Sequence, residues 1–284
     1  MVNKLALGTV QFGLDYGINN NSGQVSSKGV QEILALAKSK GIYTIDTAFA
    51  YGNSEIVLGK FNLQNEFKVV SKLPTEGRNT PKYFLNQSLK NLGLPKIYGY
   101  LLHNFSIYKQ NKSIWQDLIA LKSDGLIEKI GVSLYSVEEL EELWSDGVQL
   151  DLVQVPYNLF DRRFDNVFPE LKKRGVEVHT RSTFLQGLFF ISTKDLPNHF
   201  NSVRKKLIFL HEYSKETNIS IASLCLGFVL FNINIDNIVL GVDNKNQLIE
   251  HIKTAEYLEH IDFTILKDLQ TDVLKIINPA LWEI

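Results

Sequence analysis

The chain of 284 residues is 44% hydrophobic and 21% charged, and its 30 lysines and arginines nearly balance its 31 aspartates and glutamates. Such a composition is typical of a globular protein with a large core, and the near-neutral balance gives no support for a nucleic-acid-binding surface. Since no apolar run is long enough to cross a bilayer and the N-terminus has no secretion signal, we expect a cytoplasmic protein without a membrane partner.

Short apolar runs alternate with amphipathic segments along the whole chain. Strands are predicted over residues 5–10, 42–45, 67–72, 97–103, 129–133, 152–157, 176–181 and 237–242. Helices are predicted over residues 26–41, 56–61, 81–92, 114–123, 137–144, 169–174, 220–231, 246–257 and 263–277, with a polar helical region over 198–218. Segment 11–24 is predicted to be a loop, and the single cysteine, Cys225, is interpreted as a core residue.

Eight strand-helix units without a recognisable linker predict one domain over residues 1–284. Strict alternation of strands and helices indicates a parallel sheet with helices outside it, and eight units close most simply as a (β/α)8 TIM barrel, an α/β fold. A doubly wound open sheet is the alternative. The first turn, Gly8-Thr9-Val10-Gln11-Phe12-Gly13, lacks the spacing of a dinucleotide-binding glycine motif, which favours the barrel.

Polar side chains stand at or near the ends of six predicted strands: Asp46, Lys72, His103, Ser133, Gln154 and Arg181. Because the carboxyl ends of barrel strands open on one face, where active sites are built, we expect these side chains to converge in one cleft. Tyr51 follows Asp46 by five residues, on a loop that leads into a helix. An isolated Asp/Tyr pair is more often structural, but the convergence of six polar groups favours an enzyme.

The residue types suggest proton transfer. The Tyr51 phenol, with an unperturbed pKa near 10, can exchange a proton with a carbonyl oxygen if the Lys72 cation favours its ionised form. Asp46 would hold Lys72 in place, and His103 could orient the substrate oxygen or share the proton. No nucleophilic triad and no metal site is predicted, since the six histidines are scattered and His251 and His260 fall on predicted outer helices.

The segments around these residues, together with Gly8-Thr9-Val10-Gln11-Phe12-Gly13, Gly131-Val132-Ser133, Tyr157-Asn158-Leu159 and Gly187-Leu188, resemble the aldo-keto reductase family over nearly the whole chain. The resemblance implies hydride transfer between NAD(P) and an aldehyde, ketone or sugar-like carbonyl. It implies that Tyr51 is the general acid/base, that Lys72 and Asp46 tune it, and that His103 positions the carbonyl. The cofactor contacts that it implies are Thr9, Ser133, Gln154, Arg181, Ser182, Gly241, Val242, Asp243, Gln247 and Glu250.

Three positions depart from the family pattern. Arg181 stands where an aromatic residue usually stacks on the nicotinamide, and Leu134 stands where asparagine is common. Gln247 replaces a familiar arginine for the 2′-phosphate, and Asp243 adds a negative charge nearby, although Lys245 could compensate. The resemblance therefore favours NADP(H) and leaves NAD(H) open, and Arg181 could instead bind an anionic or sugar-like substrate.

Two further sets of residues leave alternatives open. Five aromatic residues follow strand ends and either line a substrate pocket or pack within loops: Phe49, Phe105, Tyr135, Tyr157 and Phe160. Arg162 and Arg163 are expected to form solvated pairs with Asp161 or Asp165, with substrate binding as the alternative. Two other functions fit the same barrel, namely an isomerase or epimerase that uses the same proton relay, and a cofactor-sensing regulatory subunit. The sequence indicates neither the natural substrate nor the oligomeric state.

Overall fold

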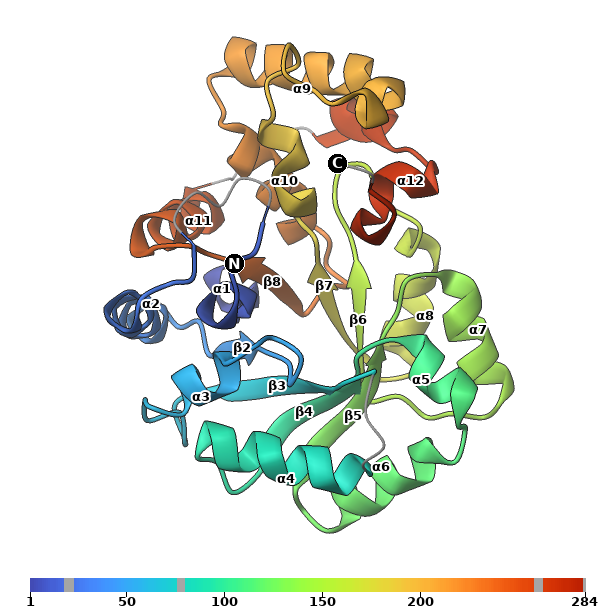
Figure 1. Cartoon of the computed structure of the whole chain (residues 1–284). Coiled ribbons are helices and arrows are strands. Elements are labelled where there is room, and N and C mark those ends of the chain that lie inside the picture. Colours follow the sequence, from blue (N-terminus) through green and yellow to red (C-terminus); the bar gives the residue numbers. More distant parts are fainter. Residues whose placement is uncertain (18–22, 76–79, 258–262, 283–284) are drawn as a thin grey trace.

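The computed structural model describes residues 1–17, 23–75, 80–257 and 263–282. Its eight parallel strands form a closed barrel in the order β1 to β8 (Figure 1). The strands are β1 Leu5–Gly8, β2 Thr44–Asp46, β3 Lys68–Leu73, β4 Ile97–Leu102, β5 Ile127–Ser133, β6 Leu152–Pro156, β7 Glu177–Arg181 and β8 Asn237–Gly241. Pairing of β8 with β1 closes the barrel. The predicted (β/α)8 fold is therefore confirmed.

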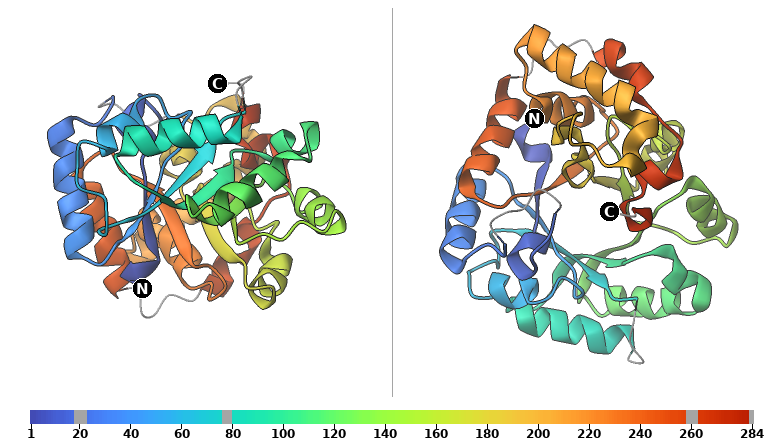
Figure 2. Two further views of the ribbon diagram at one scale, coloured as in Figure 1. Left: turned by 90° about the horizontal axis from the view of Figure 1, so that it is seen from below. Right: turned by 45° about the horizontal axis from the view of Figure 1, so that its top comes forward.

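Helices surround the strands on the outside of the barrel (Figure 2). The α-helices are α1 Val10–Gly13, α2 Ser27–Ser39, α3 Ser54–Leu58, α4 Pro81–Leu92, α5 Phe105–Gln110, α6 Ile114–Ser123, α7 Val137–Ser145, α8 Phe168–Lys173, α9 Arg204–Thr217, α10 Ile221–Leu230, α11 Lys245–Tyr257 and α12 Leu274–Ile277. The 3-10 helices are η1 Val2–Lys4, η2 Asp165–Val167, η3 Leu185–Phe190, η4 Asn198–Val203, η5 Phe263–Leu269 and η6 Pro279–Leu281. The helices predicted over 81–92 and 114–123 agree with α4 and α6.

Capping residues explain why the start and the end of a helix can be predicted from the sequence. The Thr80 hydroxyl accepts a hydrogen bond from the Tyr83 amide at the start of α4, with Pro81 in the first turn. At the other end of α4, Gly93 adopts the left-handed conformation with φ 65°. Ser136 and Glu139 form a reciprocal capping box at the start of α7.

The structure differs from prediction in three segments. The loop expected over 11–24 contains the short helix α1, and α5 follows β4 where no helix was expected. The continuous helix predicted over 263–277 is wrong, because residues 270–273, between η5 and α12, are not helical. Within that stretch the Thr271 amide donates to the carbonyl of Phe160, in the loop after β6, instead of to its own helix. Such a backbone bond to a distant loop has no signature in local periodicity.

Side chains two residues apart along a strand face the same side of the barrel wall. Val70, Leu101 and Leu152 come from β3, β4 and β6 and meet in a small apolar cluster inside the barrel. The residues two positions further along these strands are polar and line the cavity at the barrel mouth: Lys72, His103 and Gln154. The alternation thus places polar groups above an apolar plug.

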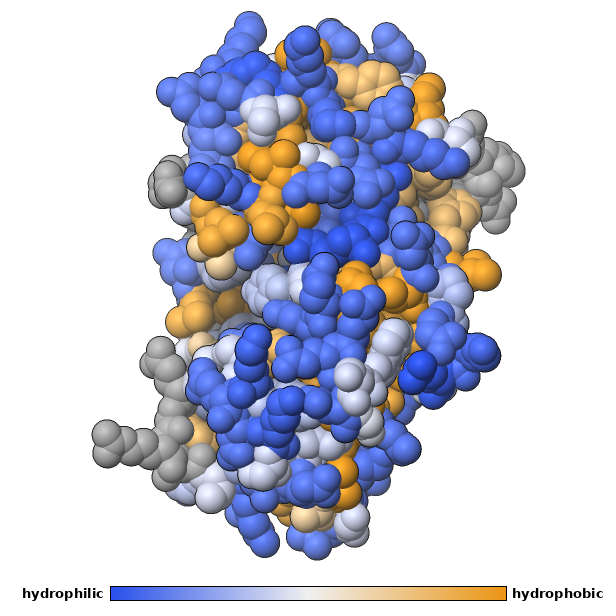
Figure 3. All heavy atoms as spheres, turned by 90° about the vertical axis from the view of Figure 1, so that its right-hand side faces the viewer, coloured by the Kyte–Doolittle hydropathy of each residue, from blue (hydrophilic) through white to orange (hydrophobic). Residues whose placement is uncertain are grey.

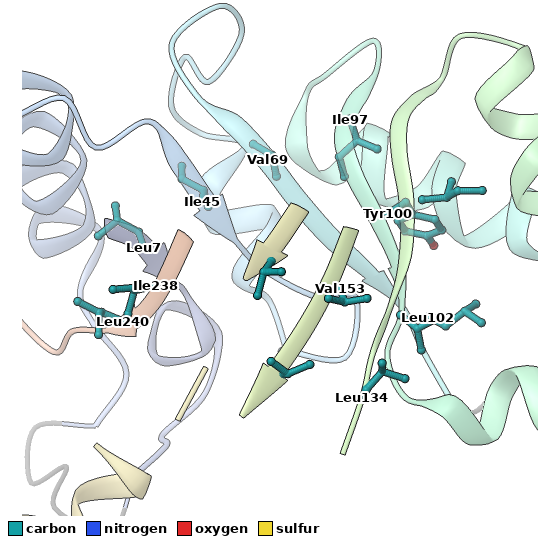
Figure 4. Packing of buried hydrophobic residues seen from close by; sticks show 14 of the residues in the cluster. Leu7, Ile45, Val69, Ile97, Tyr100, Leu102, Leu134, Val153, Ile238 and Leu240 are labelled. Atoms are coloured by element: carbon teal, nitrogen blue, oxygen red, sulfur yellow. The ribbon is translucent and has the colours of Figure 1, made fainter. Parts of the chain in front are cut away.

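The residues of opposite parity form the main hydrophobic core between the barrel and its helices. Figure 4 shows Leu7, Ile45, Val69, Leu102 and Val153 in this cluster, each from a different strand. Residues of α2, α4 and α6 pack in the same core. Its continuity fixes the strand register, because a slip by one residue would exchange the core face for the polar interior face.

A second hydrophobic cluster is formed by residues that include members of α9, α10, η5 and α12. Cys225 is fully buried in it, as predicted for a core residue. The face drawn in Figure 3 carries mainly hydrophilic residues, with apolar ones in separate groups between them. In the described part of the chain we find no helix with the length and apolar character needed to span a membrane. The cytoplasmic location stays a prediction.

Candidate active site

A buried ion pair joins the ends of β2 and β3. Since Asp46 pairs with Val70 in the sheet, Lys72 lies two residues further along β3 and reaches back over the end of β2. Its Nζ lies 2.6 Å from Asp46 Oδ1 and donates a second hydrogen bond of 2.9 Å to the Thr47 carbonyl. Burial is the largest single effect and lowers the pKa of Lys72, but the charges and hydrogen bonds of Asp46 and Tyr51 together outweigh burial, so the pKa is raised. Lys72 is therefore a fixed positive charge at neutral pH.

The second oxygen of Asp46 is also used. Gln154 Nε2, at the end of β6, donates a 2.7 Å hydrogen bond to Asp46 Oδ2. Ser133, at the end of β5, is the sheet partner of Gln154, and both side chains line the cavity above the barrel. Asp46 on β2 thus accepts hydrogen bonds from side chains on β3 and β6. Gln154 donates one of these bonds and also lines the cavity.

Tyr51 lies on the loop between β2 and α3, with its ring against the ion pair. Lys72 Nζ is 5.2 Å from the centre of the Tyr51 ring. The Tyr51 and His103 rings pack edge to face, with centroids 5.7 Å apart. Burial raises the pKa of Tyr51, while the Lys72 charge opposes that rise by favouring the ionised phenol. Tyr51, Lys72, Asp46 and His103 are thus brought together as the sequence predicted.

A buried hydroxyl network positions the Tyr51 loop. The Ser54 hydroxyl, at the start of α3, lies 2.9 Å from Thr9 Oγ1 and 2.8 Å from the Thr9 carbonyl, and Thr9 Oγ1 donates to the Asp46 carbonyl. Gly13 of α1 lies against the loop so closely that a Cβ atom there would be 1.9 Å from the Tyr51 carbonyl oxygen. The predicted cofactor contact Thr9 therefore lines the cavity while its hydroxyl is used within the protein.

His103 follows the last residue of β4 and faces Tyr51. Burial lowers its pKa to about 4, with a smaller contribution in the same direction from the Lys72 charge. The imidazole is therefore neutral at pH 7, with one N–H donor and one acceptor nitrogen. A neutral ring can donate a hydrogen bond to a carbonyl oxygen without adding charge to the site.

The cavity above these groups has a volume of about 670 Å³. It is lined by all four residues above and by nearly every predicted cofactor contact: Thr9, Ser133, Gln154, Arg181, Ser182, Gly241, Asp243, Gln247 and Glu250. Val242 is the exception, because its side chain is fully buried in the main hydrophobic core. A site of this size and mixed polarity is typical of a small-molecule or cofactor pocket.

The part of the cavity next to α11 is acidic and amide-rich. Gln247 Nε2 donates to Asp243 Oδ2, and the Asp243 amide donates to Gln247 Oε1, so the two residues form a closed pair. Asp243 Oδ1 is buried and has no hydrogen-bond partner among the residues that the structure describes. The buried His251 stacks on Phe184 at 5.1 Å, and both rings line the cavity. Burial lowers the pKa of His251 to about 4, so this aromatic wall carries no charge at pH 7.

Arg181, the last residue of β7, lines the same cavity near Tyr51. Its guanidinium stacks on the Tyr135 ring, with Cζ 4.2 Å from the ring centre. The next residue, Ser182, has a left-handed backbone with φ 64°, and its carbonyl accepts a 3.0 Å hydrogen bond from Asn158 Nδ2. Non-glycine residues in this conformation cluster at functional sites, where the surrounding structure holds them.

A sequence model described as the aldo/keto reductase family matches residues 4–269. The chain belongs to the aldo-keto reductase family. The methylglyoxal reductase DkgA of Escherichia coli O157:H7 is 33% identical over 147 residues, which cover 49% of this chain and 51% of that protein. An uncharacterized oxidoreductase of Schizosaccharomyces pombe is 32% identical over 139 residues, covering 45% of this chain and 50% of that protein. The chain thus spans about half the length of these curated relatives.

A solved structure supports the fold of this aldo-keto reductase. The holo form of an aldo-keto reductase from Bacillus halodurans superimposes with a TM-score of 0.72, covering 99% of this chain and 94% of that one. The two sequences are 20% identical, so the likeness concerns the barrel and not the ligand. Among the described residues of the present chain, no group of three or more His, Cys, Asp or Glu side chains is arranged to hold a metal ion.

The aromatic residues around the aldo-keto reductase cavity are mostly not the expected ones. Of the five candidates, Tyr135 lines the cavity. The other four pack elsewhere, in the hydrophobic clusters: Phe49, Phe105, Tyr157 and Phe160. The remaining aromatic walls come from Tyr16, Phe184 and Phe190, which the sequence did not single out, and from the imidazole of His251.

Of the arginine pairs expected after β6, the Arg163–Asp161 pair forms, but the expectation that it is solvated is wrong. Arg163 binds both carboxylate oxygens of the fully buried Asp161, at 2.8 and 3.0 Å, and donates to the Tyr135 carbonyl. Arg162 is 8% exposed, packs on the Phe228 ring and donates to a backbone carbonyl of η5. Both arginines thus support the wall that carries Tyr135 and the C-terminal cluster.

His251 lies on the outer helix α11, as expected, and its ring also forms part of the cavity wall, which was not predicted. The spacing held a usable signal, because Gln247 and His251 are four residues apart and so lie on one helical face. His260, which was expected on the same outer layer, lies outside the described residues. Tyr16 and Phe184 lie on loops before α2 and after β7, where periodicity gives no indication of direction.

Proposed function

We propose that this chain is a nicotinamide-dependent oxidoreductase that interconverts a carbonyl compound and its alcohol, with Tyr51 as general acid/base. The observation that carries this proposal is the contact of Tyr51 with both the buried Asp46–Lys72 pair and the neutral His103 ring. Membership of the aldo-keto reductase family supports the same chemistry.

The four residues have complementary tasks in reduction. A bound reduced nicotinamide would supply hydride to the carbonyl carbon, while the carbonyl oxygen takes the proton of the Tyr51 hydroxyl. The Lys72 ammonium stabilises the phenolate that this transfer leaves, and Asp46 keeps Lys72 charged and in place. His103, neutral at pH 7, donates a hydrogen bond to the carbonyl oxygen. Oxidation of the alcohol uses the same groups in reverse.

The cavity residues fit a nicotinamide dinucleotide. Ser133 and Gln154 offer hydroxyl and amide groups beside the four catalytic candidates, where a carboxamide can bind. At the α11 end, the unpartnered Asp243 Oδ1 is an acceptor that a ribose hydroxyl could satisfy, as acidic residues do in other dinucleotide sites. The Phe184 and His251 rings provide a flat wall for a base.

The charges at the α11 end support NAD(H) as the cofactor. The cavity lining of the described chain contains two permanent cations, Lys72 and Arg181, and both interact with Tyr51. The α11 end presents Asp243 and Glu250, and Lys245 is exposed outside the lining. A 2′-phosphate placed there would meet carboxylates without a cation to offset them. The family resemblance favours NADP(H), but on these charges we propose NAD(H) as the cofactor.

Fluorescence titration of the purified protein with NADH and NADPH tests the cofactor assignment. Saturable NADH binding that is at least about tenfold tighter than NADPH binding is expected, and the reverse order would contradict the choice of NAD(H). Tyr51→Phe should then bind NADH as the wild type does but lose on the order of 10²-fold or more in kcat/KM. Full turnover in this variant would contradict the role of Tyr51, and no binding of either nucleotide would favour the isomerase or epimerase reading.

A further inference from the structure

The Arg181 guanidinium forms no salt bridge with a carboxylate of the described chain, although its charge acts more weakly on Asp161, which is bound by Arg163. Its hydrogen bonds go to the Leu134 carbonyl, 3.3 Å from Nη2, and to Ser182 Oγ, 3.4 Å from Nη1. Both acceptors are uncharged and both contacts are long for a guanidinium. None of the salt bridges found among the described residues includes Arg181. This arginine therefore keeps donors available to the cavity.

The neighbouring charges are already matched. Lys72 pairs with Asp46 at 2.6 Å, and Asp161 is occupied by a bidentate contact with Arg163. Burial dominates the pKa values of Tyr51 and His103, and the Arg181 charge adds a smaller effect that lowers both. The catalytic end of the cavity thus has one uncompensated positive charge, close enough to act on the groups that face the carbonyl.

The orientation of Arg181 is set before any ligand arrives. The Tyr135 ring stacks on one face of the guanidinium, and Tyr135 is itself held by Arg163, which donates to its carbonyl at 2.6 Å. The next residue along the chain is also held, because Asn158 Nδ2 donates a hydrogen bond to the Ser182 carbonyl. A planar fork held in this way loses little conformational freedom when it binds an anion, and it matches carboxylate or phosphate oxygens in pairs.

We propose that Arg181 selects carbonyl substrates that carry an anionic group, a carboxylate or a phosphate, which the guanidinium binds while Tyr51 and His103 engage the carbonyl oxygen. This inference rests on the proposed function, since it names the substrate class of the same site. The competing role for Arg181 is contact with the cofactor. Arg181 stands with Tyr135 and Tyr51 at the catalytic end, where the nicotinamide is also proposed to bind, whereas Asp243 and Gln247 stand at the end assigned to the adenosine. The nicotinamide ring has no negative charge to pair with the guanidinium, which favours an anionic substrate as its partner.

Matched acid and ester pairs test the proposal. The probes are glyoxylate, succinate semialdehyde and 4-carboxybenzaldehyde, each against its methyl ester, and glyceraldehyde 3-phosphate against glyceraldehyde. Binding to the protein with NAD⁺ present is measured by calorimetry, and kcat/KM is measured with NADH. We expect at least one anionic probe to be favoured about tenfold or more over its uncharged partner, and which probe it is distinguishes carboxylate from phosphate.

Three variants locate the effect. Arg181→Met should abolish the preference for the anionic probe and leave NADH affinity within about twofold, and Arg181→Lys should keep part of it because the charge remains. Arg174→Met is the matched control, since Arg174 also stacks on an aromatic ring, Trp144, at 4.4 Å, but directly follows α8 and does not line the cavity. This control should retain the wild-type preference.

Other outcomes overturn the proposal. Equal affinity for acids and esters in the wild type would contradict it, and so would a tenfold loss of NADH affinity in Arg181→Met with the anion preference unchanged, which would assign Arg181 to the cofactor. The anion titrations are repeated without nucleotide. If NADH and NADPH fail to bind but the wild type still prefers the anionic probes, the oxidoreductase assignment fails while the role of Arg181 stands.

Discussion

Lys72 donates a 2.6 Å hydrogen bond to Asp46 at the barrel mouth, and the two side chains are 1% and 3% exposed. Asp46→Asn keeps the shape of the acid but leaves a buried ammonium without its counter-charge. We expect the free energy of unfolding to fall by about 3–5 kcal/mol and kcat/KM to fall with it, because burial then lowers the pKa of Lys72. Urea denaturation and steady-state kinetics at pH 7 measure both effects.

A surface pair provides the control for Asp46→Asn. Lys38 and Glu66 are 2.7 Å apart, a similar distance, but their side chains are 52% and 29% exposed, so Glu66→Gln should cost less than about 1 kcal/mol. In the wild type the raised pKa of Lys72 contributes stability that is present below its unfolded pKa, about 10.4, and is lost as the pH rises through the folded value. Equal losses in both variants would contradict the buried-pair interpretation.

Gly13 should be a positioning residue for Tyr51. In Gly13→Ala the new Cβ would lie 1.9 Å from the Tyr51 carbonyl oxygen and 2.5 Å from the Ser54 amide, so the Tyr51 loop must move. We expect a loss of about 1–3 kcal/mol in the free energy of unfolding and a drop in kcat that exceeds the change in NADH affinity. Thermal denaturation, kinetics and NADH titration are the measurements.

Gly29→Ala is the matched control, because Gly29 lies in α2 and its Cβ would meet a Val25 methyl group at 3.0 Å and no backbone atom. Alanine should be tolerated there, since it favours helix over glycine by up to about 1 kcal/mol. Wild-type kcat in Gly13→Ala would show that the tight contact between α1 and the Tyr51 loop does not position the phenol.

The catalytic candidates could be predicted because residues at the carboxyl ends of the strands in such a barrel all lie at one mouth. Lys72 and Gln154 each follow an interior apolar residue by two positions, so the period of a strand directs them to the mouth. The cavity-lining residues that were not predicted lie on loops and helices. Phe184 comes two residues after Ser182, whose backbone has a left-handed conformation. The periodicity of strands and helices does not predict where a loop of this kind directs its side chains.

The errors on charged and C-terminal residues have a related cause. Adjacent charges at residues 161–163 suggested a solvated cluster, but the fold buries Asp161 completely and uses Arg163 to support Tyr135. The break between η5 and α12 depends on a hydrogen bond from Thr271 to Phe160, more than a hundred residues away. Contacts between residues so distant in the sequence can be identified only when the tertiary structure is known.

His251 should make the protein sensitive to acid. Its folded pKa of about 4 lies below the unfolded value of about 6.5, so the unfolded state takes up the proton first as the pH falls. Stability should therefore decrease between about pH 6.5 and pH 4, by up to about 1.4 kcal/mol per pH unit from this residue. His251→Asn should make the urea midpoint less dependent on pH over this range.

Other groups titrate in the same range, so the comparison is made between variants. His199→Asn, at a partly exposed position where the ring contacts the Lys275 carbonyl, removes one histidine without touching the cavity. A pH dependence that is identical in the wild type and His251→Asn would contradict the assignment of a neutral, buried His251.

Exchange of charge at the α11 end should reverse the cofactor preference. The double variant Asp243→Asn, Gln247→Arg removes the carboxylate with the unpartnered oxygen, breaks its closed pair with Gln247 and adds a guanidinium. We expect NADPH affinity to rise by about 10- to 100-fold relative to NADH, because a charge-assisted bond replaces repulsion. Gln64→Arg adds the same charge at an exposed site remote from the cavity and should leave the ratio unchanged. The NADPH gain should shrink at high salt, since it depends on charge, and a gain that does not change with ionic strength would attribute the effect to altered packing instead.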